Sequence, residues 1–182
     1  MAIITVTFAT FVSDAGIGTV AWSNPGNAAA ADGLYAGPVA LGGGAISHYL
    51  KCTNRSGAAI PTGATINGFA LRYLCSFGSV IARDKAIRIV KSGVIGATDK
   101  SDTVNNWNLT TDTTQTRGGT ADLWGESWTA ADVNAANFGF AIACWRPTGT
   151  TPNASGRINY VEADVYYTPV VSGSAGNYFM VG

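Results

Sequence analysis

The chain has 182 residues, of which 47% are hydrophobic and 12% are charged, and its 11 basic and 11 acidic residues give a formal net charge of zero. Nucleic-acid-binding proteins usually carry an excess of positive charge, because phosphate neutralisation supplies most of their affinity. The balanced charge therefore argues against nucleic acid as a partner. A surface this poor in charge favours a protein that packs against copies of itself or within a larger assembly.

The first strand is expected within residues 1–12, which alternate apolar side chains with threonines. The segment has no basic start, so it is read as a strand and not as a signal peptide. No run approaches the roughly 20 apolar residues that a membrane helix needs. We therefore expect a protein that is made in a cytoplasm and has no membrane contact. Residues 13–44 are punctuated by glycine and proline, which disfavours long regular elements.

Further strands follow in the middle of the chain. Residues 64–77 alternate, so that one face carries Phe69, Leu71, Tyr73 and Cys75. Residues 81–91 predict another strand, with Ile87 and Ile89 on one face. Residues 93–119 are polar and rich in threonine, with Trp107 as their large anchor.

One short helix and two last strands complete the pattern. Thr129-Ala-Ala-Asp132 has capping-box spacing, with Asp in place of the usual Glu or Gln, and predicts one or two helical turns. Two alternating rows follow: Phe138, Phe140, Ile142 and Cys144, then Val161, Ala163, Val165 and Tyr167. The sequence predicts an all-β fold: an antiparallel β-sandwich, jelly-roll-like, with one short helical turn.

A single sandwich domain is expected over residues 1–168, followed by a glycine-rich C-terminal tail over residues 169–182. The tail ends in Tyr178, Phe179, Met180 and Val181. Exposed apolar residues at the end of a glycine-rich segment would be unfavourable in an isolated molecule. We therefore expect this tail to dock on a neighbouring subunit or surface.

The three cysteines, Cys52, Cys75 and Cys144, have no paired spacing, so they predict neither a disulfide framework nor a metal site. Cys75 and Cys144 lie in apolar strands, where a free cysteine behaves as a small buried hydrophobe. Reduced, structural thiols are the preferred interpretation, with one disulfide as the alternative.

A catalytic set is not evident. The single histidine, His48, lies in a short predicted strand, and no Gly-x-Ser-x-Gly nucleophile motif occurs. Glu162 and Asp164 would share one strand face about 7 Å apart, which is compatible with an inverting glycosidase pair but also with an ordinary solvent face. Asp99-Lys-Ser-Asp102 only faintly resembles a calcium loop. We expect no enzymatic activity, no cofactor and no metal site.

Several motifs together resemble a known module. They are Trp22-Ser-Asn-Pro-Gly-Asn27 with Asp32-Gly33, the segment Ile60–Gly68, the segment Asp122–Asn134, Asn137-Phe-Gly139, and Val165-Tyr-Tyr-Thr168. Their order is similar to that of a recurrent β-sandwich module of tailed-bacteriophage virion structural proteins, of the capsid decoration, head-fibre or tail-associated type. The likeness covers about residues 22–168 and identifies the scaffold better than the role.

This resemblance implies a non-enzymatic virion structural protein. The role we favour is a capsid decoration (cement) protein that self-associates, with a trimer as the suggested homo-oligomer, and stabilises the particle. Its partners would be the major capsid protein or another virion protein, and its location the virion. Contacts with neighbours are expected from Tyr178, Phe179, Met180 and Val181, and next from Ile3, Ile4 and Val6.

The alternative is a receptor- or glycan-binding module of a phage fibre or tail. It would use exposed aromatic platforms, for which the candidates are Trp107, Trp124 and Trp128. The competing interpretation is that these tryptophans are anchors of the core and its turns.

Overall fold

A computed structural model describes residues 1–77, 81–108, 110–147 and 156–170. Its main sheet has eight antiparallel strands in the order β7-β6-β9-β4-β1-β10-β5-β8. Their bounds are β1 (Ala2–Asp14), β4 (Tyr49–Ser56), β5 (Thr65–Phe77), β6 (Arg83–Lys91), β7 (Val94–Ile95), β8 (Thr113–Gly119), β9 (Gly139–Trp145) and β10 (Gly156–Thr168). A separate two-stranded ribbon pairs β2 (Trp22–Ser23) with β3 (Gly37–Pro38).

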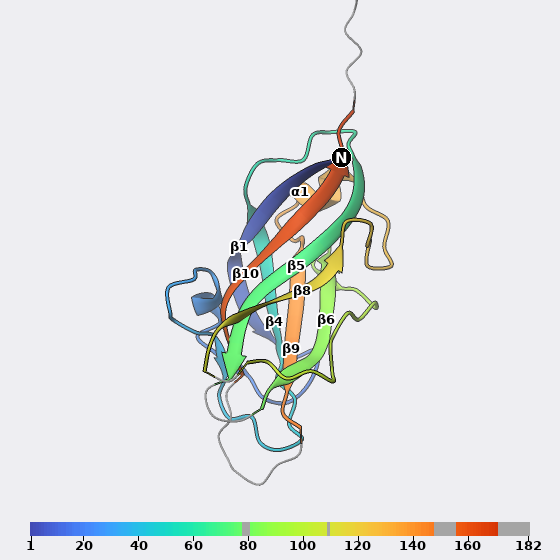
Figure 1. Cartoon of the computed structure of the whole chain (residues 1–182). Helices are drawn as coiled ribbons and strands as arrows, with labels where there is room; N and C mark the ends of the chain where they lie inside the picture. Colours follow the sequence, from blue (N-terminus) through green and yellow to red (C-terminus); the bar gives the residue numbers. More distant parts are fainter. Residues whose placement is uncertain (78–80, 109, 148–155, 171–182) are drawn as a thin grey trace, which may run out of the picture.

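The sandwich is formed by two halves of one curled sheet. In Figure 1, β1, β10 and β5 run diagonally across β4, β9 and β6. Ring contacts cross the space between the halves, since Phe69 on β5 lies 5.6 Å from Phe138 and Phe8 on β1 lies 6.0 Å from Phe140 on β9, centroid to centroid. The predicted all-β antiparallel class is confirmed.

The strand alternation seen in the sequence defines the inner faces. The inward row of β5 is buried, and the inward rows of β6, β9 and β10 belong to the same cluster. Because successive side chains of a strand point to opposite faces, each strand commits one row to this core. The rows predicted to share a face are buried together: Phe69, Leu71, Tyr73, Cys75, Ile87, Ile89, Phe138, Phe140, Ile142, Cys144, Val161, Ala163 and Val165.

In the part of the chain that the structure describes, helical structure is confined to short pieces, the 3₁₀ turn η1 (Pro25–Ala28) and the helix α1 (Ala130–Asn134). The predicted capping box is confirmed at α1. The Thr129 hydroxyl accepts a hydrogen bond from the Asp132 backbone N–H at 3.1 Å, and the Asp132 carboxylate accepts one from the Thr129 backbone N–H at 2.9 Å. These bonds satisfy backbone donors that a short helix leaves unpaired.

Among the described residues, no helix is both long and apolar enough to span a membrane.

The predicted first strand is confirmed as β1, and it lies in the middle of the sheet between β10 and β4. Its inward residues Val6 and Phe8 enter the core. On the outward face, Thr5 lies opposite Asp164 of β10 and donates a hydrogen bond to it at 2.7 Å. The outer face is therefore polar where β1 meets β10, and a side-chain contact joins the two strands there.

Candidate functional site

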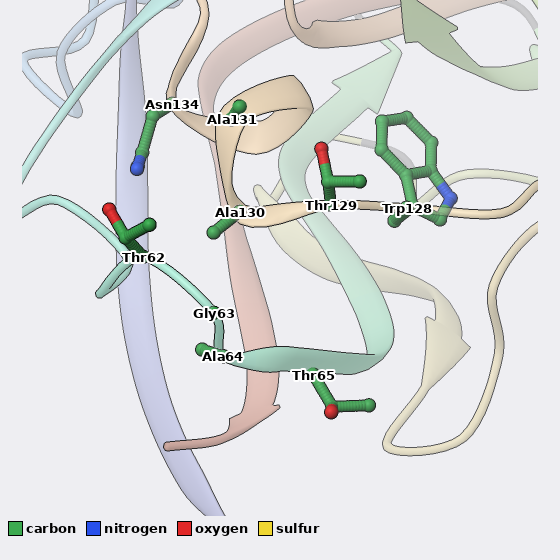
Figure 2. Close-up of a pocket in the computed structure, with 9 residues that line it drawn as sticks. All are labelled: Thr62, Gly63, Ala64, Thr65, Trp128, Thr129, Ala130, Ala131 and Asn134. Carbon is green, nitrogen blue, oxygen red and sulfur yellow. The ribbon is translucent and has the colours of Figure 1, made fainter. Parts of the chain in front are cut away.

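An open groove lies at one end of the sandwich, between the turn that precedes β5 and the helix α1 (Figure 2). Its volume is about 610 Å³, within the range of roughly 300–1,000 Å³ that small-molecule sites occupy. We call it the α1 groove. Its lining residues are Thr62, Gly63, Ala64, Thr65, Trp128, Thr129, Ala130, Ala131 and Asn134.

The wall formed by residues 61–64 is a tight turn. The Ala64 backbone N–H donates to the Pro61 carbonyl at 3.1 Å, and Gly63 has a φ of +80°. A positive φ at the third residue of such a turn is disfavoured for side chains other than glycine, and it is typical of a type II turn. The Ile-Pro-Thr-Gly sequence thus determines this wall locally.

Asn134 fastens the two walls together. Its side-chain amide donates to the Ile60 carbonyl at 2.8 Å, and its side-chain carbonyl accepts from the Ile60 backbone N–H at 2.9 Å. Arg55 on β4 donates a further hydrogen bond to the same carbonyl at 3.2 Å. The last residue of α1 therefore holds the strand-entry turn at a fixed distance, which makes the groove a preformed feature.

Trp128 forms the aromatic end of the groove. Its indole N–H donates to the Leu123 carbonyl at 3.0 Å, and its ring packs edge-on against Phe69 at a centroid distance of 4.9 Å. The side chain is half-buried, and the Lys91 ammonium lies 5.3 Å from the ring centroid. None of the described residues that line the groove is ionisable. The groove therefore offers methyl, aromatic, hydroxyl and amide groups for contact.

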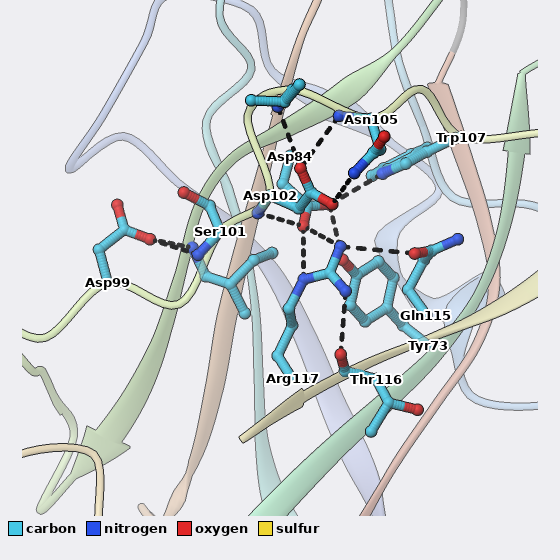
Figure 3. A network of polar contacts seen from close by, with 12 residues as sticks. Tyr73, Asp84, Asp99, Ser101, Asp102, Asn105, Trp107, Gln115, Thr116 and Arg117 are labelled. Atoms are coloured by element: carbon cyan, nitrogen blue, oxygen red, sulfur yellow. Dashed lines mark hydrogen bonds and ion pairs between the residues drawn. The ribbon is translucent and has the colours of Figure 1, made fainter. Parts of the chain in front are cut away.

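Apart from the α1 groove, a polar cluster lies inside the sandwich, around Asp84 of β6 (Figure 3). Its carboxylate is fully buried and accepts hydrogen bonds from the Tyr73 hydroxyl at 2.6 Å, the Trp107 indole N–H at 2.8 Å and the Asp102 backbone N–H at 3.0 Å. Arg117 of β8 donates to it from Nε at 2.8 Å and lies 2.6 Å away through Nη2. A buried carboxylate with this set of partners is compensated by both charge and hydrogen bonds.

The cluster also shifts the pKa values of the Tyr73 phenol and the Arg117 guanidinium. Burial raises the pKa of Tyr73 well above its usual value, and the negative charge of Asp84 raises it further. For Arg117 burial lowers the pKa, but Tyr73 and Asp84 outweigh that effect and the net shift is upward. The tyrosine is thus held neutral and the arginine charged, which suits a fixed structural tie between β6 and β8.

The tryptophans proposed as platforms are placed very differently. Trp107 and Trp124 are only 2% and 1% exposed, and their indole N–H groups donate to Asp84 at 2.8 Å and to the Phe69 carbonyl at 3.2 Å. Because both rings lie within the core, neither can serve as an exposed sugar platform in this fold, and both are anchors. Only Trp128 of the three lines an open surface.

The N-terminal residues expected to contact a neighbour differ in how exposed they are. Ile3 is 55% exposed on the outer face of β1, whereas Ile4 is partly buried against the core. Val6 is fully buried, so it is a core residue and the expectation that it touches a neighbour does not fit this fold. The remaining candidates, Tyr178, Phe179, Met180 and Val181, lie outside the described residues.

The carboxylates of the hydrolase hypothesis are brought together on the outer face of β10, where Arg72 of β5 pairs with both. Its Nε lies 2.8 Å from Glu162, and its Nη1 contacts Asp164. Two carboxylates paired with one guanidinium form a local ion-pair network, and this arrangement explains their position without catalysis.

The other polar candidates also have local partners. His48 contacts the Ser13 hydroxyl through Nδ1 at 3.2 Å, and that hydroxyl accepts from the Trp22 backbone N–H at 2.9 Å. Asp99 and Asp102 accept hydrogen bonds from the backbone N–H groups of Ser101 and Val104, each two residues further along. In the described part of the chain, no group of three or more histidine, cysteine or acidic side chains is arranged to hold a metal ion. The three cysteines are buried free thiols.

Comparison with known proteins finds no matching family model, no matching curated protein and no matching solved structure.

Proposed function

We propose that this protein is a non-enzymatic structural protein of a virus particle, of the capsid decoration type, which binds the particle and copies of itself. The sequence motifs from Trp22 to Thr168 suggest the module. The observation that carries the proposal is the combination of a rigid, internally compensated body with exposed aliphatic side chains near the two ends of β1, on either side of its threonines. Met1, Ile3 and Val12 are all exposed, and Ile3 and Val12 belong to this central strand.

The internal contacts support a mechanical role. The motif residues Trp22, Trp124 and Asn134 all act within the fold, since the Trp22 indole N–H donates to the His48 carbonyl at 2.7 Å and the other two hold turns. Three acidic side chains form ion pairs with arginines: Asp84 with Arg117, and Glu162 and Asp164 with Arg72. A body whose polar groups bind one another leaves its apolar surface as the means of association.

A test measures binding to shells assembled from the major capsid protein of the particle to which the chain is proposed to belong. Because a protein that binds only the assembled shell stabilises it by linkage, adding the purified protein is expected to raise the melting temperature of the shell. Ile3→Asp should weaken this effect, whereas Val104→Asp, an equally drastic change at an exposed loop position, should not. A wild-type protein that stays monomeric over a wide concentration range and leaves shell melting unchanged would overturn the proposal.

A glycan-binding role is the second candidate, and the half-buried Trp128 in the α1 groove favours it. An aromatic side chain that lines the same groove as the Thr62 and Thr65 hydroxyls is a combination that sugar sites use. A glycan array separates the two functions. Binding that is lost in Ala131→Arg, which would obstruct the groove, but kept in Ala136→Arg, just beyond α1, would favour the glycan role.

A further inference from the structure

We propose that the apolar segment Tyr178–Val181 of one copy occupies the α1 groove of a second copy. This inference rests on the self-association included in the proposed function and assigns it a site.

The first argument is where the chain leaves the sandwich. Val170 is the last described residue before the tail, and a Cβ at position 63 would lie 3.0 Å from its Cγ2. Gly63 lines the α1 groove, so the tail departs from the rim of this groove. Val170 itself remains 59% exposed, an apolar side chain that is only partly covered by the body it leaves.

The second argument is reach. Seven residues, 171–177, separate Val170 from Tyr178, and they include two serines, two glycines and an asparagine. Seven residues can span at most about 25 Å when fully extended. The segment can therefore reach a groove on an adjacent molecule. Exchange of identical segments between copies is a low-cost route to an oligomer, because each copy both provides and receives the same contact.

The third argument is chemical match. The groove lining described above carries no charge, and neither does Tyr-Phe-Met-Val. The small side chains of Ala130 and Ala131 leave room for an aromatic residue, and Trp128 offers a ring for edge-to-face packing or for a methionine thioether. The exposed Thr62 and Thr65 hydroxyls are available to backbone groups of an incoming segment.

The experiment uses the full chain and two single variants. Ala131→Arg blocks the groove and leaves the tail intact, whereas Phe179→Asp damages the tail and leaves the groove intact. Each variant alone should self-associate about 10-fold or more weakly than wild type, since burial of one aromatic side chain contributes about that factor. Ala136→Arg is the matched control and should self-associate as wild type does. Sedimentation analysis measures all of these species.

Mixing the two variants tests exchange directly. An equimolar mixture should form pairs, because the intact tail of Ala131→Arg can enter the open groove of Phe179→Asp. A chain that carries both Ala131→Cys and Phe179→Cys should form covalent oligomers on oxidation, and the native thiols are buried and will not compete. Covalent bonds within single chains, or none at all, would overturn the inference.

These outcomes are distinct from failure of the proposed function. Self-association that is unchanged in both Ala131→Arg and Phe179→Asp rejects the groove as the contact but leaves a self-associating structural protein. A wild-type chain that neither self-associates nor binds shells rejects both.

Discussion

Arg117 on β8 and Asp84 on β6 form a buried ion pair between two strands that are not hydrogen-bonded neighbours in the described sheet. β8 is one end of the sheet, and β6 lies beside the other end. The pair thus joins the two ends of the curl by side chains, at a place where the backbone ladder does not close. It fixes how far the two halves of the sandwich open.

Removing the cation of this pair is expected to destabilise the protein strongly. Arg117→Met would leave the fully buried Asp84 carboxylate without a counter-charge, at a cost of about 3–5 kcal/mol in the free energy of unfolding. Lys100→Met is the comparison, since the Lys100–Asp122 pair has the same kind of contact at 2.9 Å but is about one-third exposed, and its loss should cost under about 1 kcal/mol. Urea unfolding curves measure both, and equal losses would refute the role assigned to Asp84.

Two adjacent glycines on β8 should respond in opposite ways to a methyl group. A Cβ at Gly118 would lie 2.3 Å from the Phe69 carbonyl oxygen and 2.7 Å from the Trp124 indole nitrogen, and Gly118 has a φ of +84°. A Cβ at Gly119 would meet nothing within 4 Å. Gly118→Ala should therefore lower the melting temperature by several degrees or prevent folding, because strain and overpacking add. Gly119→Ala should have little effect, and thermal unfolding of the two variants provides the comparison.

Acid should destabilise the fold through carboxylates whose pKa is lowered. Hydrogen bonds from the Asn105 backbone and side chain lower the pKa of Asp102 to about 2, and those from the Thr129 hydroxyl and backbone lower the pKa of Asp132. In the unfolded chain an aspartate has a pKa near 3.9. The unfolded state therefore takes up protons first as the pH falls, and stability is present above about pH 4 and lost toward pH 2.

Asp102→Asn should make this loss of stability shallower, because the variant removes one of the groups that titrates differently in the two states. Glu126→Gln removes the same charge elsewhere and serves as the control. The free energy of unfolding, measured between pH 2 and pH 6, checks this prediction. A steeper dependence in Asp102→Asn would contradict it.

The native thiols should resist labelling. Burial raises the pKa of Cys52 and of Cys144 to about 12, and that of Cys75 well above its usual value. Since the thiolate is the reactive form, a thiol reagent at pH 8 should modify the folded protein very slowly and all three cysteines after unfolding. The absorbance of the chromophore that the reagent releases measures the rate of cysteine modification. Rapid modification of the native protein would mean that one of these sites opens to solvent.

The strands could be predicted because their signal is local. Alternation in residues 64–77 and the capping box at Thr129 each depend on neighbours in sequence, and both are confirmed. The α1 groove could not be predicted in this way. Its walls meet through the hydrogen bonds between Asn134 and Ile60, which are 74 residues apart, and no local pattern encodes such a pairing.

The tryptophans also show the difference between what local sequence determines and what distant contacts determine. Trp124 is followed by glycine, and its φ of +56° places it in a tight turn, a setting compatible with either an exposed or a buried ring. Its position in the core depends on the Phe69 carbonyl from β5, which accepts its indole N–H. For Asp84, the sequence shows an acidic residue in a strand, but its partners come from β5, β8 and the loop at residues 102–107. The burial of Trp124 and the partners of Asp84 therefore both depend on tertiary contacts, which local sequence does not reveal.

The central position of β1 has a consequence for how the chain reaches its native state. One neighbour of β1 is β10, and the hydrogen bond between Thr5 and Asp164 joins residues separated by 159 positions. β1 can complete its pairing only after β10, near the end of the described chain, has left the ribosome. Contacts this distant in sequence make folding slow, and until they form β1 presents an apolar strand edge to other chains. Rapid synthesis at high concentration would expose that edge most, so the demand for assistance in folding should fall on β1.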